Sequence, residues 1–106
     1  MANKNIKFEY KGIKYTLEFT KRTERMMEAN GFNIGLVGEK PQTMIPELFA
    51  GAFLCNHRST KRELIDEIYD QISDKEGLLT KLGEMYNEPL EALMDSQGNL
   101  NWEASW

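Results

Sequence analysis

The sequence predicts an α+β fold, in which an N-terminal antiparallel β-hairpin packs on about four to five α-helices. From Ile6 to Phe19, apolar residues alternate with polar ones, which is the period of half-buried strands. Beyond Thr20 the apolar residues recur every three or four positions, which is the spacing of helices that bury one face. The 106 residues match the usual size of one domain. We therefore expect a single α+β domain over residues 1–94 and a C-terminal tail over residues 95–106.

The hairpin is predicted to turn at Lys11 and Gly12. A two-residue turn there brings the apolar side chains onto one face, pairing Tyr10 with Ile13, Phe8 with Tyr15, and Ile6 with Leu17. Gly12 supplies the positive φ angle that such a turn requires. Because Lys11 suits the turn less well than Asn would, a variant with a glycine bulge is an equal alternative. Because an isolated hairpin is only marginally stable, we expect the helices to cover its aromatic face.

Capping residues place the first two helices. Thr20 is expected to cap a helix over residues 21–30, which Gly31 ends. A glycine-rich loop follows, and Thr43 is the predicted cap of the second helix. That helix contains the apolar run over residues 48–55, and it is expected to be buried because it is apolar nearly all round.

Two capping-box patterns predict the starts of two more helices, at residues 60–63 and 73–76. The apolar stripe of the last helix continues in phase after Pro89, which predicts a helix that is kinked or divided there. In the tail, Leu100 and Trp102 alternate with polar residues. The tail therefore either adds a third, edge strand to the hairpin or remains flexible.

Cys55 and His57 are the only cysteine and the only histidine in the chain. On a helix, residues two positions apart point roughly 200° from each other, which disfavours a nucleophile–base pair. We therefore expect Cys55 to be a buried core residue. We expect His57 to complete the last helical turn, with its ring near the terminal carbonyl groups.

The remaining polar residues do not form a recognisable catalytic or metal-binding pattern. One histidine and one cysteine cannot complete a tetrahedral nitrogen and sulfur site for zinc. The third predicted helix carries four acidic residues: Glu63, Asp66, Glu67 and Asp70. We interpret them as a solvated face, and an enzyme or regulatory domain that uses them is an alternative hypothesis. The sequence predicts no catalytic, metal-binding or cofactor-binding residue, and a protein that is not an enzyme.

Charge is unevenly distributed along the chain, whose net charge is −4. Residues 1–25 carry seven basic and three acidic side chains, whereas residues 26–106 carry six basic and fourteen acidic ones. The basic residues alternate with apolar ones, as on a solvated sheet face, so we predict no nucleic-acid partner. The opposite charges of the two parts of the chain favour head-to-tail alignment of copies of the chain, or of a partner with it. No run approaches the ~20 apolar residues of a membrane span, and no signal peptide is evident, so we expect no membrane partner and a cytoplasmic location.

Four stretches of the sequence carry a family resemblance: FEYKGIKYTLEFTKRT, TMIPELFAGAFLCNHRSTKRELIDEIYDQI, KEGLLTKLGEMYNEPLEALM and GNLNWE. Together they resemble small proteins from tailed phages and prophages of Gram-positive bacteria, from Phe8 to about Glu103. Those proteins are regarded as tail assembly chaperones, similar in role to the lambda tail assembly chaperone. The resemblance rests on structural motifs and brings no catalytic residues with it.

The resemblance implies a non-enzymatic assembly factor of the host bacterial cytoplasm. It would bind the long tape-measure protein, and in some cases the tail-tube subunit, and keep them soluble until the tube polymerises. Many such chaperones are also made in a longer, frameshifted form, in which case this chain is the short form. The alternative is a minor structural tail or connector protein of a phage or prophage virion.

Five residues are candidates for binding partners or further copies of the chain: Phe8, Tyr15, Gly51, Trp102 and Trp106. The first two lie on the hairpin, whose open edge can pair with another strand. Gly51 lies in a cluster of small residues that permits close approach of another backbone. The two tryptophans are large aromatic anchors on an otherwise polar segment, which either bind a partner or dock on the chain's own sheet.

Overall fold

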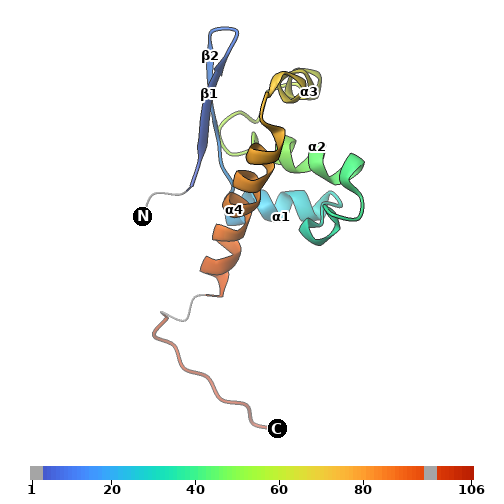
Figure 1. Cartoon of the computed structure of the whole chain (residues 1–106). Helices are drawn as coiled ribbons and strands as arrows, with labels where there is room; N and C mark the ends of the chain where they lie inside the picture. Colours follow the sequence, from blue (N-terminus) through green and yellow to red (C-terminus); the bar gives the residue numbers. More distant parts are fainter. Residues whose placement is uncertain (1–3, 95–97) are drawn as a thin grey trace.

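The hairpin stands beside a group of four α-helices in the computed structural model, which describes residues 4–94 and 98–106 (Figure 1). The strands are β1 (Ile6–Tyr10) and β2 (Ile13–Leu17). The helical elements follow in the order α1 (Lys21–Ala29), the short 3-10 helix η1 (Ile34–Leu36), α2 (Pro41–Gly51), α3 (Arg62–Gln71) and α4 (Lys75–Leu93). The α+β prediction is therefore confirmed.

The hairpin has the predicted register, with Ile6 opposite Leu17, Phe8 opposite Tyr15 and Tyr10 opposite Ile13. Lys11 and Gly12 both have positive φ angles, 50° and 80°, which is the geometry of a type I′ turn. Next to the turn, the Tyr10 hydroxyl donates a 2.7 Å hydrogen bond to Oε2 of Glu67 on α3. Lys11 Nζ lies 3.1 Å from the same oxygen, so both side chains hold the hairpin tip against α3.

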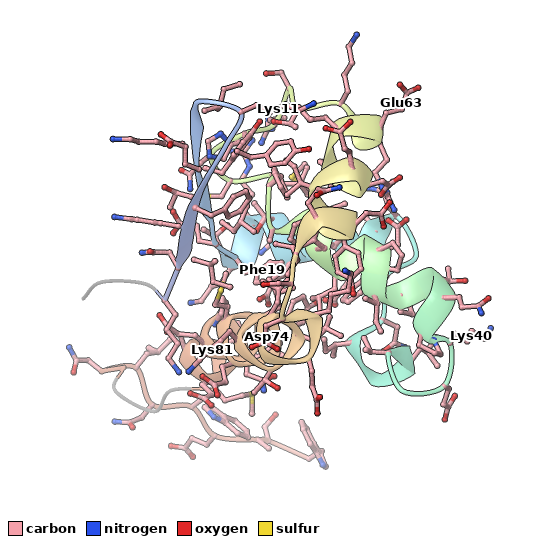
Figure 2. All side chains as sticks on the ribbon, turned by 45° about the horizontal axis from the view of Figure 1, so that its top comes forward. Lys11, Phe19, Lys40, Glu63, Asp74 and Lys81 are labelled. Atoms are coloured by element: carbon pink, nitrogen blue, oxygen red, sulfur yellow. The ribbon has the colours of Figure 1, made fainter. Side chains whose placement is uncertain are left out.

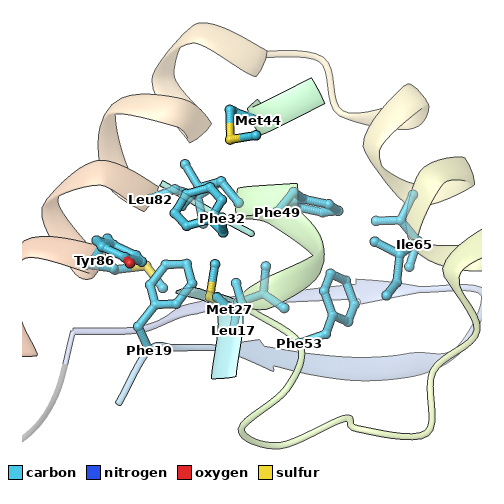
Figure 3. Close-up of a cluster of buried hydrophobic side chains, with 14 of the residues drawn as sticks. Leu17, Phe19, Met27, Phe32, Met44, Phe49, Phe53, Ile65, Leu82 and Tyr86 are labelled. Carbon is cyan, nitrogen blue, oxygen red and sulfur yellow. The ribbon is translucent and has the colours of Figure 1, made fainter. Parts of the chain in front are cut away.

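Aromatic side chains connect the hairpin to the helices in one core (Figure 3). Phe53, which follows α2, is 1% exposed and meets the Tyr15 ring edge-on, at 5.7 Å between centroids. On its other side Phe53 meets Phe49 of α2 at 5.2 Å. At the α4 side of the core, the Tyr86 ring meets Phe19 edge-on at 5.2 Å and Phe32 at a tilt at 5.5 Å between centroids. The aromatic face of the hairpin is thus covered by α2 and the residues after it, as its marginal stability requires.

The predicted cap of α1 is confirmed, because Thr20 and Thr23 form a reciprocal capping box. The predicted start of α2 at Thr43 is wrong. That helix begins at Pro41, a residue whose fixed φ angle and missing N–H suit the first helical turn, and no side chain caps it. Pro46 consequently lies inside α2 rather than in its first turn, and α2 ends at Gly51, four residues before Cys55.

The predicted starts of α3 and α4 are each shifted by one residue. Lys61 is the N-cap of α3 and makes no capping bond with its side chain, so the expected box from Thr60 does not form. Asp74, rather than Ser73, caps α4 by accepting a 2.9 Å hydrogen bond from the Gly77 N–H. Helix α4 is continuous through Pro89, so it is not divided there.

Residues 98–106, called the C-terminal segment below, have no regular secondary structure and project away from the helices (Figure 1). The sheet has only β1 and β2 in the described part of the chain, so the predicted third strand is not formed. Residues 95–97 of the predicted tail lie outside the described residues. The radius of gyration is 15.9 Å, against about 13 Å for a compact domain of this length, because of this projection. Among residues 4–94 and 98–106, no helix combines the length and hydropathy of a bilayer span.

Gly12→Ala is expected to lower the free energy of unfolding by about 1 kcal/mol, because a Cβ atom is strained at the positive φ of the turn. Gly83→Ala is the matched control, because its added Cβ has open space and no positive φ. It should raise the free energy of unfolding by about 0.5–1 kcal/mol through helix propensity. Urea denaturation of both variants measures the two effects, and a neutral Gly12→Ala would contradict the turn assignment.

Candidate interaction surface

The outer edge of β2 is closed by residues 52–57, called the edge segment below. The Glu18 N–H donates a 3.2 Å hydrogen bond to the Ala52 carbonyl. The Thr16 N–H donates a 2.9 Å bond to His57 Nε2, and the Thr16 carbonyl accepts a 3.2 Å bond from the Asn56 side chain. Because an unpaired strand edge is a template for another strand, these bonds remove β2 as a docking edge.

His57 therefore acts as a hydrogen-bond acceptor within the fold. Its ring packs against Tyr15 at 5.1 Å and against Phe53 at 6.4 Å between centroids. The expectation that the ring lies at helix-terminal carbonyls is wrong, because α2 ends at Gly51 and the chain then turns toward β2. Accepting the Thr16 N–H requires an unprotonated Nε2, which fixes the neutral tautomer with its proton on Nδ1.

Cys55 is exposed, so the prediction of a buried core cysteine is wrong. The prediction depended on a helix that reached residue 55, whereas the turn after Gly51 directs this side chain outward. Partial burial of the thiol raises the pKa of Cys55, and the neighbouring Glu18 carboxylate raises it further. A raised pKa lowers the fraction of reactive thiolate. Since the Nε2 of His57 is already bonded to Thr16, Cys55 and His57 do not form a nucleophile–base pair.

An apolar groove of about 570 Å³ runs beside β1 and is called the β1 groove below. Its apolar lining comes from the hairpin and from the junction of α3 with α4: Ile6, Phe8, Tyr10, Ile68, Ile72 and Leu78. The charged residues of its lining are Glu9 of β1, Asp74, which caps α4, and Lys81 of α4, and Figure 2 labels the last two. The β1 groove thus lies along β1, whereas the edge segment lies along β2, the other strand of the hairpin.

The C-terminal segment exposes its large apolar side chains. Leu100 is 92% exposed, Trp102 is 81% exposed and Trp106 is fully exposed. At the end of α4, Leu93 and Met94 are also exposed. Large, exposed aromatic side chains are the kind of residue that carries binding energy at interfaces.

The structure separates the five predicted interaction residues into two groups. Tyr15 and Gly51 are buried, and an added Cβ at Gly51 would overlap the Met27 side chain of α1, so the close approach there is between helices of the same chain. Phe8 is half-buried and lines the β1 groove, while Trp102 and Trp106 are exposed. The sequence did not predict that residues of α3 and α4 form one wall of the groove. Its residues belong to apolar stripes that the sequence does not divide into core and surface positions.

One buried ionisable group lies away from these surfaces. Glu24 of α1 is 4% exposed, and its Oε2 has no hydrogen-bond partner among the residues that the structure describes. Burial raises the pKa of this carboxyl to about 8, and the charge of Glu28 contributes to the rise. Burial likewise raises the pKa of Tyr86 to about 12, with smaller contributions from the charges of Glu24 and Glu28. Glu24 is therefore a source of pH-dependent stability.

Within residues 4–94 and 98–106, no group of three or more histidine, cysteine, aspartate or glutamate side chains is placed to hold a metal ion. A family model described as a domain of unknown function, DUF5055, matches residues 1–106. The chain belongs to the DUF5055 family. Comparison with curated proteins and with solved structures found no match. For this DUF5055 protein, the functional argument therefore rests on the geometry of the hairpin, the β1 groove and the C-terminal segment.

His57→Ala is expected to lower the free energy of unfolding by about 1–3 kcal/mol, because it leaves the Thr16 N–H without its partner. The same change should accelerate hydrogen exchange at the Thr16 amide. Arg58→Ala is the control, since this exposed neighbour should change stability by no more than about 0.5 kcal/mol. Unchanged Thr16 exchange in His57→Ala would show that the edge segment does not close β2.

Glu24→Gln is expected to stabilise the protein at alkaline pH. The folded chain binds the Glu24 proton more tightly than the unfolded chain, so the free energy of unfolding falls as pH rises from about 4.5 to about 8. The glutamine variant stays neutral, and its advantage should grow over that window to about 5 kcal/mol, at about 1.4 kcal/mol for each unit by which the pKa of Glu24 is raised. Glu28→Gln should narrow the window by lowering the pKa of Glu24. A pH-independent difference between parent and Glu24→Gln in urea denaturation would contradict the assignment.

Proposed function

We propose that this DUF5055 protein is a non-enzymatic tail assembly chaperone of a phage or prophage. It binds the tape-measure protein, and where present the tail-tube subunit, in the host bacterial cytoplasm during tail morphogenesis. The class of protein comes from the resemblance of its sequence to that family. The geometry supports a binding role, because the chain presents an apolar groove and exposed aromatic side chains.

The exposure of Trp102 and Trp106 is the observation that supports this proposal most strongly. Both side chains lie on a segment without regular secondary structure, so they can adapt to a client without disturbing the core. Each tryptophan offers roughly 150–250 Å² of surface to a partner. A protein that holds an aggregation-prone client in solution needs apolar anchors of this kind surrounded by polar residues, and the neighbouring residues Asn99, Asn101 and Glu103 are polar.

The alternative is a minor structural tail or connector protein, for which the same exposed segment would serve as a permanent attachment. The two proposals differ in where the protein is found after assembly. A chaperone leaves when the tail tube polymerises, so mass spectrometry of purified particles should not detect it. Stoichiometric amounts in purified particles would favour the structural role.

Trp102→Ala combined with Trp106→Ala is expected to reduce recovery of co-expressed tape-measure protein in a pull-down by at least about tenfold, because each anchor removed costs about 1–2 kcal/mol. The matched control is Asn99→Ala combined with Asn101→Ala, which changes two exposed polar positions of the same segment. The control should recover the tape-measure protein at the parental level.

Equal recovery with the tryptophan variant would remove the C-terminal segment from client binding. Failure of the parental protein itself to recover the tape-measure protein, with both proteins soluble, would overturn the chaperone proposal.

A further inference from the structure

The two edges of the hairpin differ. The outer edge of β2 is bonded to the edge segment through Thr16 and Glu18. Strand β1 pairs only with β2 in the described chain, so its outer edge from Ile6 to Tyr10 has no neighbouring strand there. Natural proteins cover or pair such edges, because an open strand edge recruits another strand.

The β1 groove has the shape and lining that an added strand requires. One wall is the hairpin face with Ile6 and Phe8, and the other is the end of α3 and the first half of α4 with Ile72 and Leu78. An extended segment placed there would bond to the β1 backbone and put alternate side chains into the apolar lining. A segment with an apolar residue at every second position is therefore the matching occupant.

We propose that the C-terminal segment of a second copy of this chain occupies the β1 groove and adds a strand to β1. The segment has the required alternation, with apolar residues at every second position: Leu100, Trp102, Ala104 and Trp106. It has no regular secondary structure of its own, and its large apolar side chains are exposed.

Charge favours a second copy over the chain's own groove. The hairpin region, residues 4–18, carries four basic side chains (Lys4, Lys7, Lys11 and Lys14) against two acidic ones (Glu9 and Glu18), a net charge of +2, whereas the chain after Lys81 contains no basic residue. The second half of α4 and the C-terminal segment are acidic, through Glu84, Glu88, Glu91 and Glu103. To reach its own groove, the segment would fold back for roughly 20 Å beside α4, against charges of the same sign. On a second copy it meets a basic hairpin instead.

The interface is head to tail, because the groove of one copy takes the segment of the next. Such a heterologous contact leaves a free groove at one end and a free segment at the other. Copies can therefore add in sequence, into a ring if the rotation closes and a filament if it does not. The tests below use this chain without tape-measure protein, so their outcome does not depend on client binding.

Intrinsic fluorescence provides a direct test, because the only two tryptophans are Trp102 and Trp106, both in the C-terminal segment. In dilute full-length protein the emission should be that of water-exposed tryptophan. It should shift to shorter wavelengths as concentration rises, in step with the mass measured by sedimentation velocity. Emission that is shifted at every concentration would mean docking on the chain's own groove, and exposed emission at every concentration would mean no docking. Either result overturns the proposal.

A pair of variants tests the head-to-tail geometry. One lacks the occupant (Trp102→Ala with Trp106→Ala), and the other blocks the groove (Ile72→Glu). Ile72 is chosen because it lines the groove but is not part of the core packing. Each variant alone should remain monomeric, while their mixture should form a one-to-one dimer that grows no further. Self-association of either variant alone, or a mixture that stays monomeric, overturns the proposal.

A peptide competition keeps the proposal testable if Ile72→Glu does not fold. A synthetic peptide of residues 98–106 in excess should dissociate the parental assembly. The same peptide with both tryptophans replaced by alanine should leave it intact. Equal effects of the two peptides, or no effect of either, would contradict occupation of the groove by this segment.

Discussion

The bonds between the edge segment and the outer edge of β2 are the interaction on which the rest of this structure depends. A two-stranded hairpin has too little apolar surface to be stable alone. Here His57, Asn56 and the Ala52 carbonyl satisfy the backbone groups of Thr16 and Glu18. The same turn places Phe53 under Tyr15, so hydrogen bonding and aromatic packing hold the hairpin at one position. Without this contact, β2 would be a second open edge and the aromatic face would lose part of its cover.

This constraint also determines which surface is left for binding. Since β2 is closed from within, the open edge of the sheet is β1, and the β1 groove lies along it. The exposed tryptophans lie on a separate segment that projects from the far end of α4 (Figure 1). Groove and segment are therefore displayed at different places on one chain. That arrangement is compatible with the proposed binding role, in which the chain contacts a client or further copies.

Local sequence signals predicted the local structure well. The alternation from Ile6 to Leu17 and the glycine at position 12 were enough to predict the register and the position of the turn, because both depend on neighbouring residues. The positive φ angle of Lys11 in the structure then decides between the two-residue turn and a glycine bulge. The Thr20 cap was predicted for the same reason. The start of α2 was wrong because Thr43 and Pro41 are both suitable start signals, and the sequence does not rank them.

The interaction surface could be predicted only in part. The exposed tryptophans follow from large aromatic residues on a polar segment, and Phe8 follows from the strand pattern. His57 accepts a hydrogen bond from Thr16, which lies 41 positions earlier in the chain, and no local sequence pattern predicts that bond. Cys55 was wrongly predicted to be buried, because the apolar run that suggested a helix continues for four residues after α2 has ended. The helical wall of the groove is likewise a product of tertiary packing.

The central claim is that the hairpin is closed along β2 and open along β1. Site-resolved amide hydrogen exchange at two protein concentrations tests it most directly. In dilute protein, the amides of Thr16 in β2 and of Glu18 just after it should be protected, while the amides of β1 that do not bond to β2 should exchange rapidly. In concentrated protein those β1 amides should become protected. Equal protection of both edges in dilute protein, or exchange of the β1 amides that does not change with concentration, would contradict the account.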